Sequence, residues 1–508
     1  MSCYHFNLCT KIIDLLTKNP SVVALRYDDG DYTFSDLCEI ALTWIDQFEK
    51  LGLENPTAVA IKSDKSVEAY SALLACNIMG ITYAHLDPAS PLERENHMIS
   101  KLQPSIIINF FTKEIYESSN KKSFQFKIKN QKNFSGNAKI REICLKYRNC
   151  AHGDTTAYVM FTSGSTGEPK GVAISQSSLL NFINWVADTY GISSDDRFTG
   201  LNQTYFDNSI FDFYGSVLNG ASLIPIFSDQ LKFPSRVIKY LKKKKASIWF
   251  TVPSYLIFCM RMKAISEKKL PAIKAIIFGG EAFPKAQLIE LSKLFNGVVD
   301  LYNVYGPTEA TCICSSYKIK KSDLSDFQRL APLGKIAPNF GYDIVGKDEK
   351  GIGELILRGP QIAQGYINDV AQSSIKFDAT NSFGNRVKSY KTGDLVSEED
   401  GDLHFHGRLD NQIKHMGYRI ELEEIEAYFL SSGKFVEAIA TYGCLNSINN
   451  QITLHLVSNH SKDELEQAIQ NICKRLPGYM TPQHIQFHKA LPKNANGKVD
   501  RHKLNNGK

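Results

Sequence analysis

Apolar and polar residues follow two patterns along the first hundred positions, one with a helical period and one typical of buried strands. Apolar residues with helical spacing predict a helix near Leu15 and a second helix over 66–79. Short apolar runs at 58–61 and 82–86 predict buried strands on either side of the second helix. This strand–helix–strand order is typical of parallel sheets that are covered by helices.

The same order resumes in the middle of the chain. A helix is predicted over 179–190, and buried strands are predicted near Phe198 and over 247–252 and 275–278. Residues 111–150 differ, because they are polar, rich in Lys and Asn, and poorly patterned. We interpret them as a variable surface region.

The pattern changes again after residue 330. Short strands broken by glycines, such as 354–357, predict a β-rich, barrel-like unit over 330–400. A small α+β unit begins at about residue 411, with a helix over 422–430 and a strand over 453–457. A chain of 508 residues is too long for one hydrophobic core, so we expect at least two domains.

Composition and charge exclude several function classes. The formal net charge of +6 is small for this length and does not indicate a nucleic-acid partner. The one dense basic run, 242–245, follows apolar positions with helical spacing, which favours a solvated helix C-terminus over a nucleic-acid patch. No signal peptide and no apolar run of membrane-spanning length is evident, so we expect no membrane partner and a cytoplasmic location.

The 11 cysteines are scattered without CxxC pairs. Cys312 and Cys314 are close together but have no His or Cys partners at metal-binding spacing. We therefore interpret the cysteines as free thiols in a reducing compartment.

The segment 158–170, YVMFTSGSTGEPK, carries the strongest chemical pattern. An apolar strand runs into a loop of glycines and hydroxyl residues that presents backbone N–H groups and rotatable donors to phosphate oxygens. The loop is not a Walker A loop, because Lys170 is preceded by Pro169 and followed by Gly171. The loop residues are Thr162, Ser163, Gly164, Ser165, Thr166, Gly167 and Lys170.

This loop resembles the phosphate loop of the adenylate-forming enzymes, and further segments match the family in order. Together they run from residue 32 to residue 501, so the resemblance covers nearly the whole chain. The segments are YTFSDL (32–37), GITYAHLDP (80–88), FDNSIFDF (206–213), NVYGPTEAT (303–311), GELILRGPQIAQGY (353–366), YKTGDL (390–395), GRLDNQIKHMGYRIELEEIE (407–426) and LPKNANGKVDR (491–501). His85 and Gln364 depart from the usual Pro and Arg, and His415 and Tyr418 are more modest departures.

The resemblance implies an α/β fold in which the large domain has two doubly wound sheets plus the β-barrel-like unit. This large AMP-binding domain would cover 1–409, and a small, mobile α+β C-terminal domain would cover 411–508, with a hinge at Asp410. Its reaction would use ATP and Mg²⁺ to turn a carboxylate into an acyl-adenylate and pyrophosphate. Glu309 would hold Mg²⁺, a hard cation that favours carboxylate oxygen, and Thr308 would belong to the catalytic set.

The resemblance also assigns the nucleotide residues. Tyr305 would stack on adenine, while Gly279 and Gly280 let the backbone approach the base. Asp394 would accept hydrogen bonds from the ribose hydroxyls, with Arg408 nearby, although either could instead form a surface ion pair. The other expected ATP- or AMP-binding residues are Glu281, Asn303 and Gly306.

Lys498, in the turn-like N-G-K sequence, is the expected catalytic lysine. The family's equivalent lysine bridges the substrate carboxylate and the α-phosphate, which a compact ammonium can neutralise. Rotation about Asp410 would then withdraw Lys498 and present a face around Lys414 and Gly417 to a pantetheine thiol.

Asp207 distinguishes between branches of the family. It resembles the aspartate that holds a substrate α-ammonium in amino-acid adenylation domains, for which a ligand cation is a sensible counter-ion. A helix-capping carboxylate is the alternative. The expected substrate pocket comprises Asp207, Asn208, Phe211, Phe250, Ile277, Gly279, Val304, Cys312 and Ile313, together with Lys498.

Beyond Asp207, Asn208 and Lys498 this pocket is apolar and has no second charge, and Gly279 is expected to leave depth, which favours an uncharged branched aliphatic amino acid such as isoleucine or valine. Since one methylene changes binding by only about 1–3 kcal/mol, isoleucine is not separable from valine or leucine. Asn208 could instead hydrogen-bond a polar substrate. We expect a free-standing ligase that charges a separate carrier protein through its phosphopantetheine arm. The alternatives are an acyl- or aryl-CoA synthetase, a D-alanine–carrier protein ligase, or a non-catalytic nucleotide-binding protein.

Overall fold

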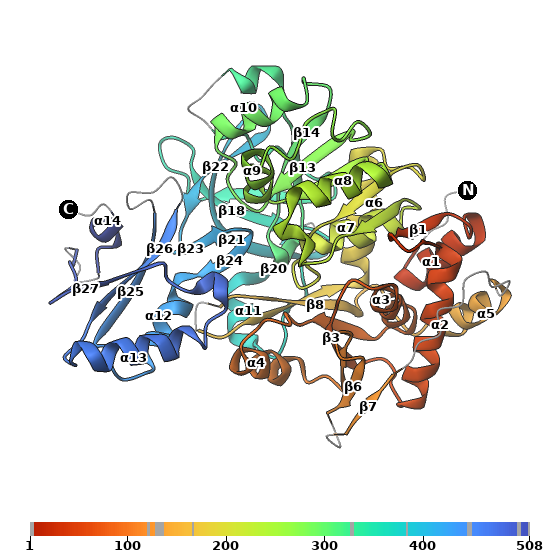
Figure 1. The fold of residues 1–508 in the computed structure, drawn as a ribbon, viewed down its shortest axis with the longest axis horizontal. Coiled ribbons are helices and arrows are strands. Elements are labelled where there is room, and N and C mark those ends of the chain that lie inside the picture. Colours follow the sequence, from red (N-terminus) through yellow and green to blue (C-terminus); the bar gives the residue numbers. More distant parts are fainter. Residues whose placement is uncertain are drawn as a thin grey trace. The chain divides into compact units, whose positions relative to one another are not determined.

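The computed structural model describes residues 5–118, 122–126, 137–164, 167–325, 330–382, 385–443, 450–494 and 499–505. The chain forms two compact units (Figure 1). The first unit comprises Met1–Leu86, Leu102–Met160 and Gly171–Gly407, and the second comprises Asp87–Lys101, Phe161–Lys170 and Arg408–Lys508. The expected division at the hinge residue Asp410 stays a prediction.

The largest sheet of the described part belongs to the first unit and has nine strands. Its central strands β14, β13, β12, β10, β11 and β1 are parallel, and antiparallel strands complete both edges. In spatial order the strands are β16 (Lys335–Ile336), β15 (Ser315–Lys318), β14 (Asp300–Tyr305), β13 (Ala275–Gly279), β12 (Ile248–Thr251), β10 (Arg197–Gly200), β11 (Ser222–Pro225), β1 (Val23–Arg26) and β2 (Asp31–Thr33).

A second sheet has eight strands in the described residues. Its middle strands β8, β4, β3 and β5 are parallel, which confirms the predicted strands at 58–61 and 82–86. In spatial order the strands are β19 (Gly365–Tyr366), β9 (Lys170–Ser175), β8 (Thr156–Thr162), β4 (Thr82–His85), β3 (Ala58–Lys62), β5 (Ile106–Asn109), β6 (Glu114–Glu117) and β7 (Ser123–Gln125).

Alternate residues of the buried strands in the nine-stranded sheet enter two different cores. Each core also contains helices, so helices cover both faces of the sheet. Phe250 and Ile277 pack in the core that contains helices α2 (Phe34–Lys50) and α3 (Val67–Met79). Their neighbours Trp249 and Ile276 pack in the other core. Runs that are apolar at every position are typical of parallel strands buried on both faces.

The core on the Phe250 side also includes α1 (Leu8–Lys18), α6 (Gln176–Tyr190) and α7 (Asn208–Val217), while α5 (Asn137–Tyr147) packs on α1 and α2. The core on the Trp249 side includes α8 (Pro234–Lys244), α9 (Pro253–Arg261) and α10 (Lys285–Leu294). Helix α3 is buried nearly all round, as expected for a helix whose residues are apolar on every side.

The predicted β-rich unit is a five-stranded antiparallel sheet that follows the nine-stranded sheet in the chain. It contains β17 (Gly341–Val345), β18 (Gly353–Arg358), β21 (Asn385–Glu399) and β20 (Phe377–Ser382), while β22 (Asp402–Arg408) pairs with β21. Helix α11 (Val370–Lys376) precedes β20. These sheets and helices confirm the predicted α/β class.

The second unit contains the small α+β assembly. Its strands are β23 (Gln412–His415), β24 (Tyr418–Glu421), β25 (Glu437–Gly443), β26 (Gln451–Val457) and β27 (His484–Phe487). Its helices are α4 (Leu92–Leu102, of which Leu102 is assigned to the first unit), α12 (Leu422–Leu430), α13 (Lys462–Cys473) and α14 (Arg501–Asn505). The predicted helix over 422–430 and strand over 453–457 are confirmed.

The region 111–150 is more regular than its sequence indicates. Where it is described, it contains β6, β7 and α5. Ile115 of β6 is buried and Phe124 of β7 packs on the core, although β7 is the edge strand of the sheet and β6 lies next to it. Strands of three or four residues leave only one or two apolar positions, too few for a recognisable period.

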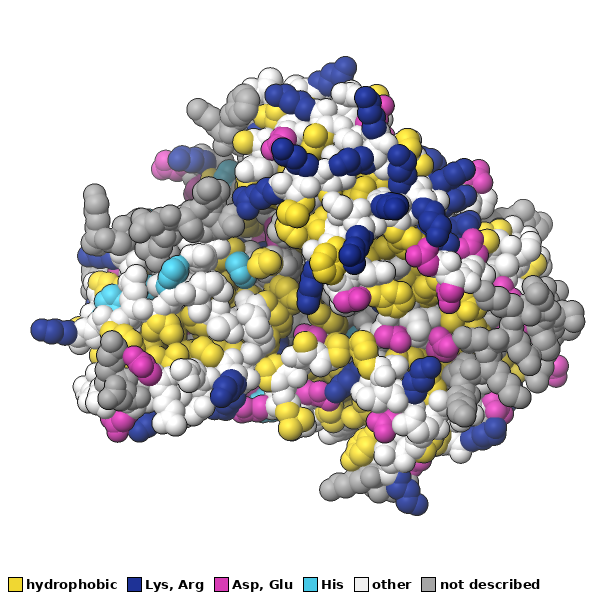
Figure 2. All heavy atoms as spheres, in the orientation of Figure 1, with side chains coloured by type: hydrophobic (Ala, Val, Ile, Leu, Met, Phe, Trp, Pro, Cys, Tyr) yellow, Lys and Arg dark blue, Asp and Glu magenta, His cyan; other side chains and the backbone are white. Residues whose placement is uncertain are grey.

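The basic run lies where the helical pattern predicted it. Lys242, Lys243 and Lys244 form the last turn of α8, and Lys245 ends the helix with a left-handed φ of 55°. Figure 2 shows Lys and Arg side chains gathered over the part of the molecule where Figure 1 places α8 and α10. In the described residues, no helix is long and apolar enough to cross a membrane.

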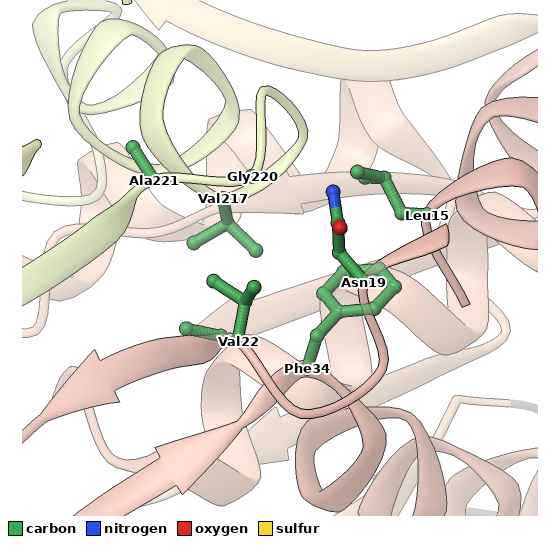
Figure 3. A pocket seen from close by; sticks show the side chains of 8 residues that line it. Leu15, Asn19, Val22, Phe34, Val217, Gly220 and Ala221 are labelled. Atoms are coloured by element: carbon green, nitrogen blue, oxygen red, sulfur yellow. The ribbon is translucent and has the colours of Figure 1, made fainter. Parts of the chain in front are cut away.

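A small apolar cavity lies away from the predicted site residues (Figure 3). Side chains of α1, β1, α2 and the end of α7 line it, and Leu15, Val22, Phe34 and Val217 surround its centre. Its volume of about 10 Å³ is close to the minimum that holds one water molecule. We therefore do not assign a ligand to it.

Candidate active site

The phosphate loop lies in the second unit, between β8 and β9. Gly164 and Gly167 close the turn through a hydrogen bond from Gly167 N to Gly164 O of 3.1 Å. A Cβ atom at Gly164 would lie 2.0 Å from Glu168 O, and Gly167 has a φ of +87°, so both positions require glycine. Ser165 and Thr166 lie outside the described residues.

The polar groups around this loop suit an anion. The Thr162 hydroxyl is buried and has no hydrogen-bond partner in the described part of the chain. Lys170 Nζ is buried and lies 3.5 Å from Glu421 Oε1. Ser163 Oγ donates to Arg419 O at 2.8 Å. A buried hydroxyl and a buried ammonium can each stabilise a phosphate oxygen.

Four of the nine predicted pocket residues, Phe250, Ile277, Gly279 and Val304, lie on parallel strands of the first unit, near their carboxyl ends. Phe250 pairs with Ile277, and Gly279 pairs with Val304 two residues further along the same strand. Cys312 and Ile313 follow the next turn of the chain and are buried in the same core. Ligands of open α/β sheets bind at this edge.

Asp207 occupies the position before the first residue of α7, Asn208, but its side chain does not cap the helix. Its Oδ2 accepts a hydrogen bond of 2.6 Å from the hydroxyl of Thr308, which is 101 positions away in the sequence. The capping alternative for Asp207 is therefore wrong. The carboxylate of Asp207 is half-buried, and Thr308 orients it.

Phe211 lies one helical turn after Asp207, on the same side of α7. Its ring is completely buried, and its centroid is 4.8 Å from Phe250, 5.5 Å from Phe198 and 5.7 Å from Tyr190. Such an aromatic cluster is close-packed and yields little to a ligand.

The expectation that Gly279 leaves depth in the pocket is wrong. A Cβ atom at Gly279 would lie 2.3 Å from the carbonyl oxygen of Val304 and 2.7 Å from its Cγ2. The space beside Gly279 is thus filled by the neighbouring strand. The glycine permits the close approach of β14.

Tyr305 and Asp394, two of the predicted nucleotide residues, are in direct contact. The Tyr305 hydroxyl donates to Asp394 Oδ2 at 2.6 Å. Burial, together with the charge of Asp394, raises the pKa of Tyr305, so the phenol stays a donor. Asn303 of the same strand donates through Nδ2 to Pro332 O at 2.7 Å.

Gly280 and Glu281 follow β13. Gly280 has a φ of +85°, a conformation that glycine adopts readily. Glu281 accepts hydrogen bonds from the backbone and the hydroxyl of Ser254, both at 3.2 Å. These contacts hold the turn after β13 against the start of α9.

Glu309, the predicted Mg²⁺ ligand, is completely buried in a 3-10 turn over Thr308–Ala310. Tyr366 donates its hydroxyl to Glu309 Oε1 at 2.8 Å. A Cβ atom at Gly306, just before this turn, would lie 2.3 Å from Cys312 O. A buried carboxylate that is oriented by a hydrogen-bond donor fits a hard cation.

Thr311 and Cys312 follow this turn in left-handed conformations, with φ of 60° and 70°. Both are buried, and neither is glycine. Such residues cost about 1–3 kcal/mol each and persist only where their surroundings hold them. Thr311 Oγ1 donates to Gln361 O at 2.6 Å, which is one such restraint.

The predicted hinge and thiolation residues lie in the second unit. Arg408 donates to Asp410 through Nε at 2.6 Å and through NH2 at 2.8 Å. Lys414 lies on β23, and Gly417, with a φ of +84°, lies in the turn between β23 and β24. Lys498 lies outside the described residues.

Sequence reasoning gave no role to several residues of this region. Tyr366 is part of the quoted segment 353–366, but nothing in that segment indicates its contact with Glu309. Tyr190 was included in a predicted helix without any sign that its ring meets Phe211. Gln364, one of the departures from the family pattern, accepts a hydrogen bond of 2.7 Å from Thr156 Oγ1.

Comparison with known proteins identifies the family of this chain. The family described as AMP-binding enzyme matches residues 15–367. A D-alanine--D-alanyl carrier protein ligase of Bacillus licheniformis is 33% identical over 364 residues, which cover 70% of this chain and 71% of the relative. A ligase of the same description from Listeria monocytogenes is 31% identical over 447 residues, covering 84% of each chain.

Among solved structures, the Vibrio cholerae adenylation domain AlmE in complex with glycyl-adenosine-5'-phosphate is similar with a TM-score of 0.82 and 21% identity. That match covers 100% of this chain and 98% of the other. At this identity the likeness shows the fold. The family match covers residues 15–367, and the relatives named above are carrier protein ligases. The chain therefore belongs to the AMP-binding enzyme family and is an AMP-forming ligase.

Proposed function

We propose that this ligase activates a small amino acid with ATP and transfers it to the phosphopantetheine thiol of a separate carrier protein. The carboxylate would attack the α-phosphorus, pyrophosphate would leave, and the aminoacyl-adenylate would then lose AMP to the thiol. The observation that carries the proposal is Asp207, a half-buried carboxylate that does not cap its helix and is oriented by Thr308.

Asp207 supports an amino acid because a carboxylate at a pocket pairs well with a ligand ammonium. The hydroxyl of Thr308 donates to Asp207 Oδ2 and so orients a carboxylate that can accept hydrogen bonds from a ligand ammonium. A fatty or aryl acid offers no cation to this group. The D-alanine ligase relatives named above are consistent with an amino-acid substrate.

The aromatic cluster around Phe211 and the filled space beside Gly279 limit the size of the substrate side chain. Phe211 is held by three other rings, and the space beside Gly279 is filled by Val304. A large side chain would have to displace one of them, at a cost of about 1–3 kcal/mol. We therefore propose a substrate of alanine size, as the names of the ligase relatives above suggest, in place of the isoleucine or valine expected from the sequence.

The remaining roles are proposed on the family resemblance and the local contacts. Thr162 and Lys170 would contact the phosphates of ATP, and Tyr305 and Asp394 would contact the nucleoside. Glu309 would hold Mg²⁺, which screens phosphate charge when it is bound. Lys498 would neutralise the carboxylate and α-phosphate as the adenylate forms, and motion at Asp410 would then admit the thiol.

ATP–pyrophosphate exchange with glycine, D-alanine, L-alanine, L-valine, L-isoleucine and a fatty acid tests the proposal. We expect exchange with the alanine-sized acids and at least tenfold weaker exchange with isoleucine. Exchange with the fatty acid alone would identify an acyl-CoA synthetase, and strong exchange with isoleucine would refute the size argument.

Lys498→Ala should abolish exchange and leave ATP binding intact. The exchange rate is measured beside the affinity for ATP, and Lys489→Ala, nine positions earlier, serves as the control. An unchanged exchange rate in Lys498→Ala would contradict its catalytic role.

A further inference from the structure

Lys65, a buried cation of the first unit, has no role in the site described above. Its side chain is only 2% exposed. Its Nζ donates to three carbonyl oxygens, those of Gly200 at 2.9 Å, Leu201 at 3.1 Å and Ile226 at 2.8 Å. An ammonium group has three N–H donors, so these carbonyls use the whole donor set of the charged form.

The three carbonyls belong to the ends of two neighbouring strands. Gly200 is the last residue of β10, and Ile226 directly follows β11. The two strands are parallel, with Gly200 opposite Pro225. Lys65 therefore ties two strands together at their carboxyl ends, the edge at which the predicted pocket residues lie.

Asp212 provides a second attachment at the same place. It lies on α7, is 2% exposed, and accepts hydrogen bonds from Asn202 N at 3.1 Å and from Asn202 Nδ2 at 3.0 Å. Asn202 Nδ2 also lies within hydrogen-bonding distance of Phe250 O, at 3.2 Å. The negative charge of Asp212 favours the charged form of Lys65, in opposition to burial, which lowers the pKa of Lys65 to about 7.

These contacts hold the beginning of the segment 201–207. Lys65 holds the carbonyls of Gly200 and Leu201, and Asp212 ties Asn202 to the second turn of α7. The segment ends at Asp207, immediately before the same helix. A short loop whose beginning is fastened to the helix into which it runs has little freedom to move its last side chain.

We propose that Lys65 is a positioning residue for the substrate site: by holding the strand ends from which segment 201–207 starts, it places Asp207 for the ammonium group of the amino acid. This inference rests on the proposed role of Asp207. Lys65 itself contacts backbone carbonyls and no reacting group.

The test compares Lys65→Met with Lys285→Met in the full chain. Methionine keeps the length of the side chain and removes the ammonium group. Lys285 is a matched control, because it is also buried in the first unit and donates to one backbone carbonyl, Asp323 O at 2.9 Å. The readouts are the KM values for the amino acid and for ATP in pyrophosphate exchange.

Lys65→Met should raise the amino-acid KM at least tenfold and change the ATP KM less than twofold. Lys285→Met should change neither KM more than twofold. The proposal would be overturned if Lys65→Met kept an amino-acid KM within twofold of that of the unsubstituted enzyme. It would also be overturned if both KM values rose equally, because a general loss of structure affects both substrates alike.

A second readout does not depend on the substrate. Amide hydrogen exchange of segment 201–207 should be at least tenfold faster in Lys65→Met than in the unsubstituted enzyme. The exchange of β13 should not change. An unchanged exchange rate in segment 201–207 would overturn the positioning role, even where amino-acid activation is intact. Should Lys65→Met not fold, Asn202→Ala removes the side-chain contacts of the other attachment, those to Asp212 and Phe250 O, and the same KM ratio and exchange rates decide. Activation of an acid without an ammonium group would instead refute the proposed function.

Discussion

The role of Asp207 is tested most directly by Asp207→Asn. Asparagine has nearly the same volume and keeps a carbonyl oxygen that can accept the hydrogen bond from Thr308. The substitution therefore removes the negative charge and preserves the shape of the site. Thr308→Val is the complementary change, because it removes the hydroxyl donor and leaves the charge.

The expected magnitudes follow from the contacts of the two residues. Loss of one partner of a buried, hydrogen-bonded charge pair costs about 2–5 kcal/mol. Asp207 is half-buried, which favours the lower part of that range, about 3 kcal/mol, or about 150-fold in kcat/KM. Loss of the single hydrogen bond of 2.6 Å in Thr308→Val costs about 1 kcal/mol, or about fivefold.

The assay is ATP–pyrophosphate exchange with D-alanine, with kcat/KM measured separately for the amino acid and for ATP. In Asp207→Asn the loss should appear in the amino-acid KM, since the charge acts on the ammonium group already in the ground state. If Asp207→Asn left the amino-acid KM unchanged, this result would refute the recognition of the ammonium group by Asp207.

Three further substitutions test other parts of the site and fold. Tyr366→Phe should raise the half-saturating Mg²⁺ concentration about fivefold, because it removes the donor that orients Glu309; an unchanged Mg²⁺ titration would contradict this. Gly279→Ala should lower the free energy of unfolding in urea by about 1–3 kcal/mol, whereas Gly478→Ala, with open space around it, should not; equal values for the two would argue against the close strand approach. Burial lowers the pKa of His85 to about 3, so the unfolded chain takes up a proton below about pH 6.5 while the folded chain does not. Stability is then lost as the pH falls, by about 2 kcal/mol between pH 6.5 and 5, and His85→Asn should reduce this loss; the same pH dependence in both proteins would show that His85 is not its source.

The sequence predicts the framework of this protein well where apolar positions repeat often enough to define a period. The helix over 66–79 and the strand over 275–278 are both observed to within a residue of their predicted bounds. The short strands β6 and β7 were missed because their few buried positions define no period. The number of residues over which the hydrophobic pattern repeats, rather than the burial of those residues, determines whether the sequence predicts an element.

The candidate site was predictable only as a set of segments. Residue types within the segments indicate their chemistry, but the pairing of Thr308 with Asp207 joins positions 101 residues apart, and no spacing rule predicts such a pair. The wrong prediction that Gly279 leaves depth in the pocket has a similar origin. A glycine in a pocket sequence can leave room for a ligand or for a neighbouring strand, and the pattern of residues does not distinguish these two outcomes.

The segment 361–366 shows how residues without ligand contacts can still determine the site. Ala363 N donates to Glu309 O at 2.8 Å, Thr311 Oγ1 donates to Gln361 O at 2.6 Å, and Tyr366 holds the Glu309 carboxylate. These contacts restrain the turn that contains Glu309, including the left-handed residue that follows it. Since Thr308 in the same turn orients Asp207, we expect a change in segment 361–366 to alter the affinities for both the proposed Mg²⁺ and the proposed amino acid, which titrations of pyrophosphate exchange with each would measure.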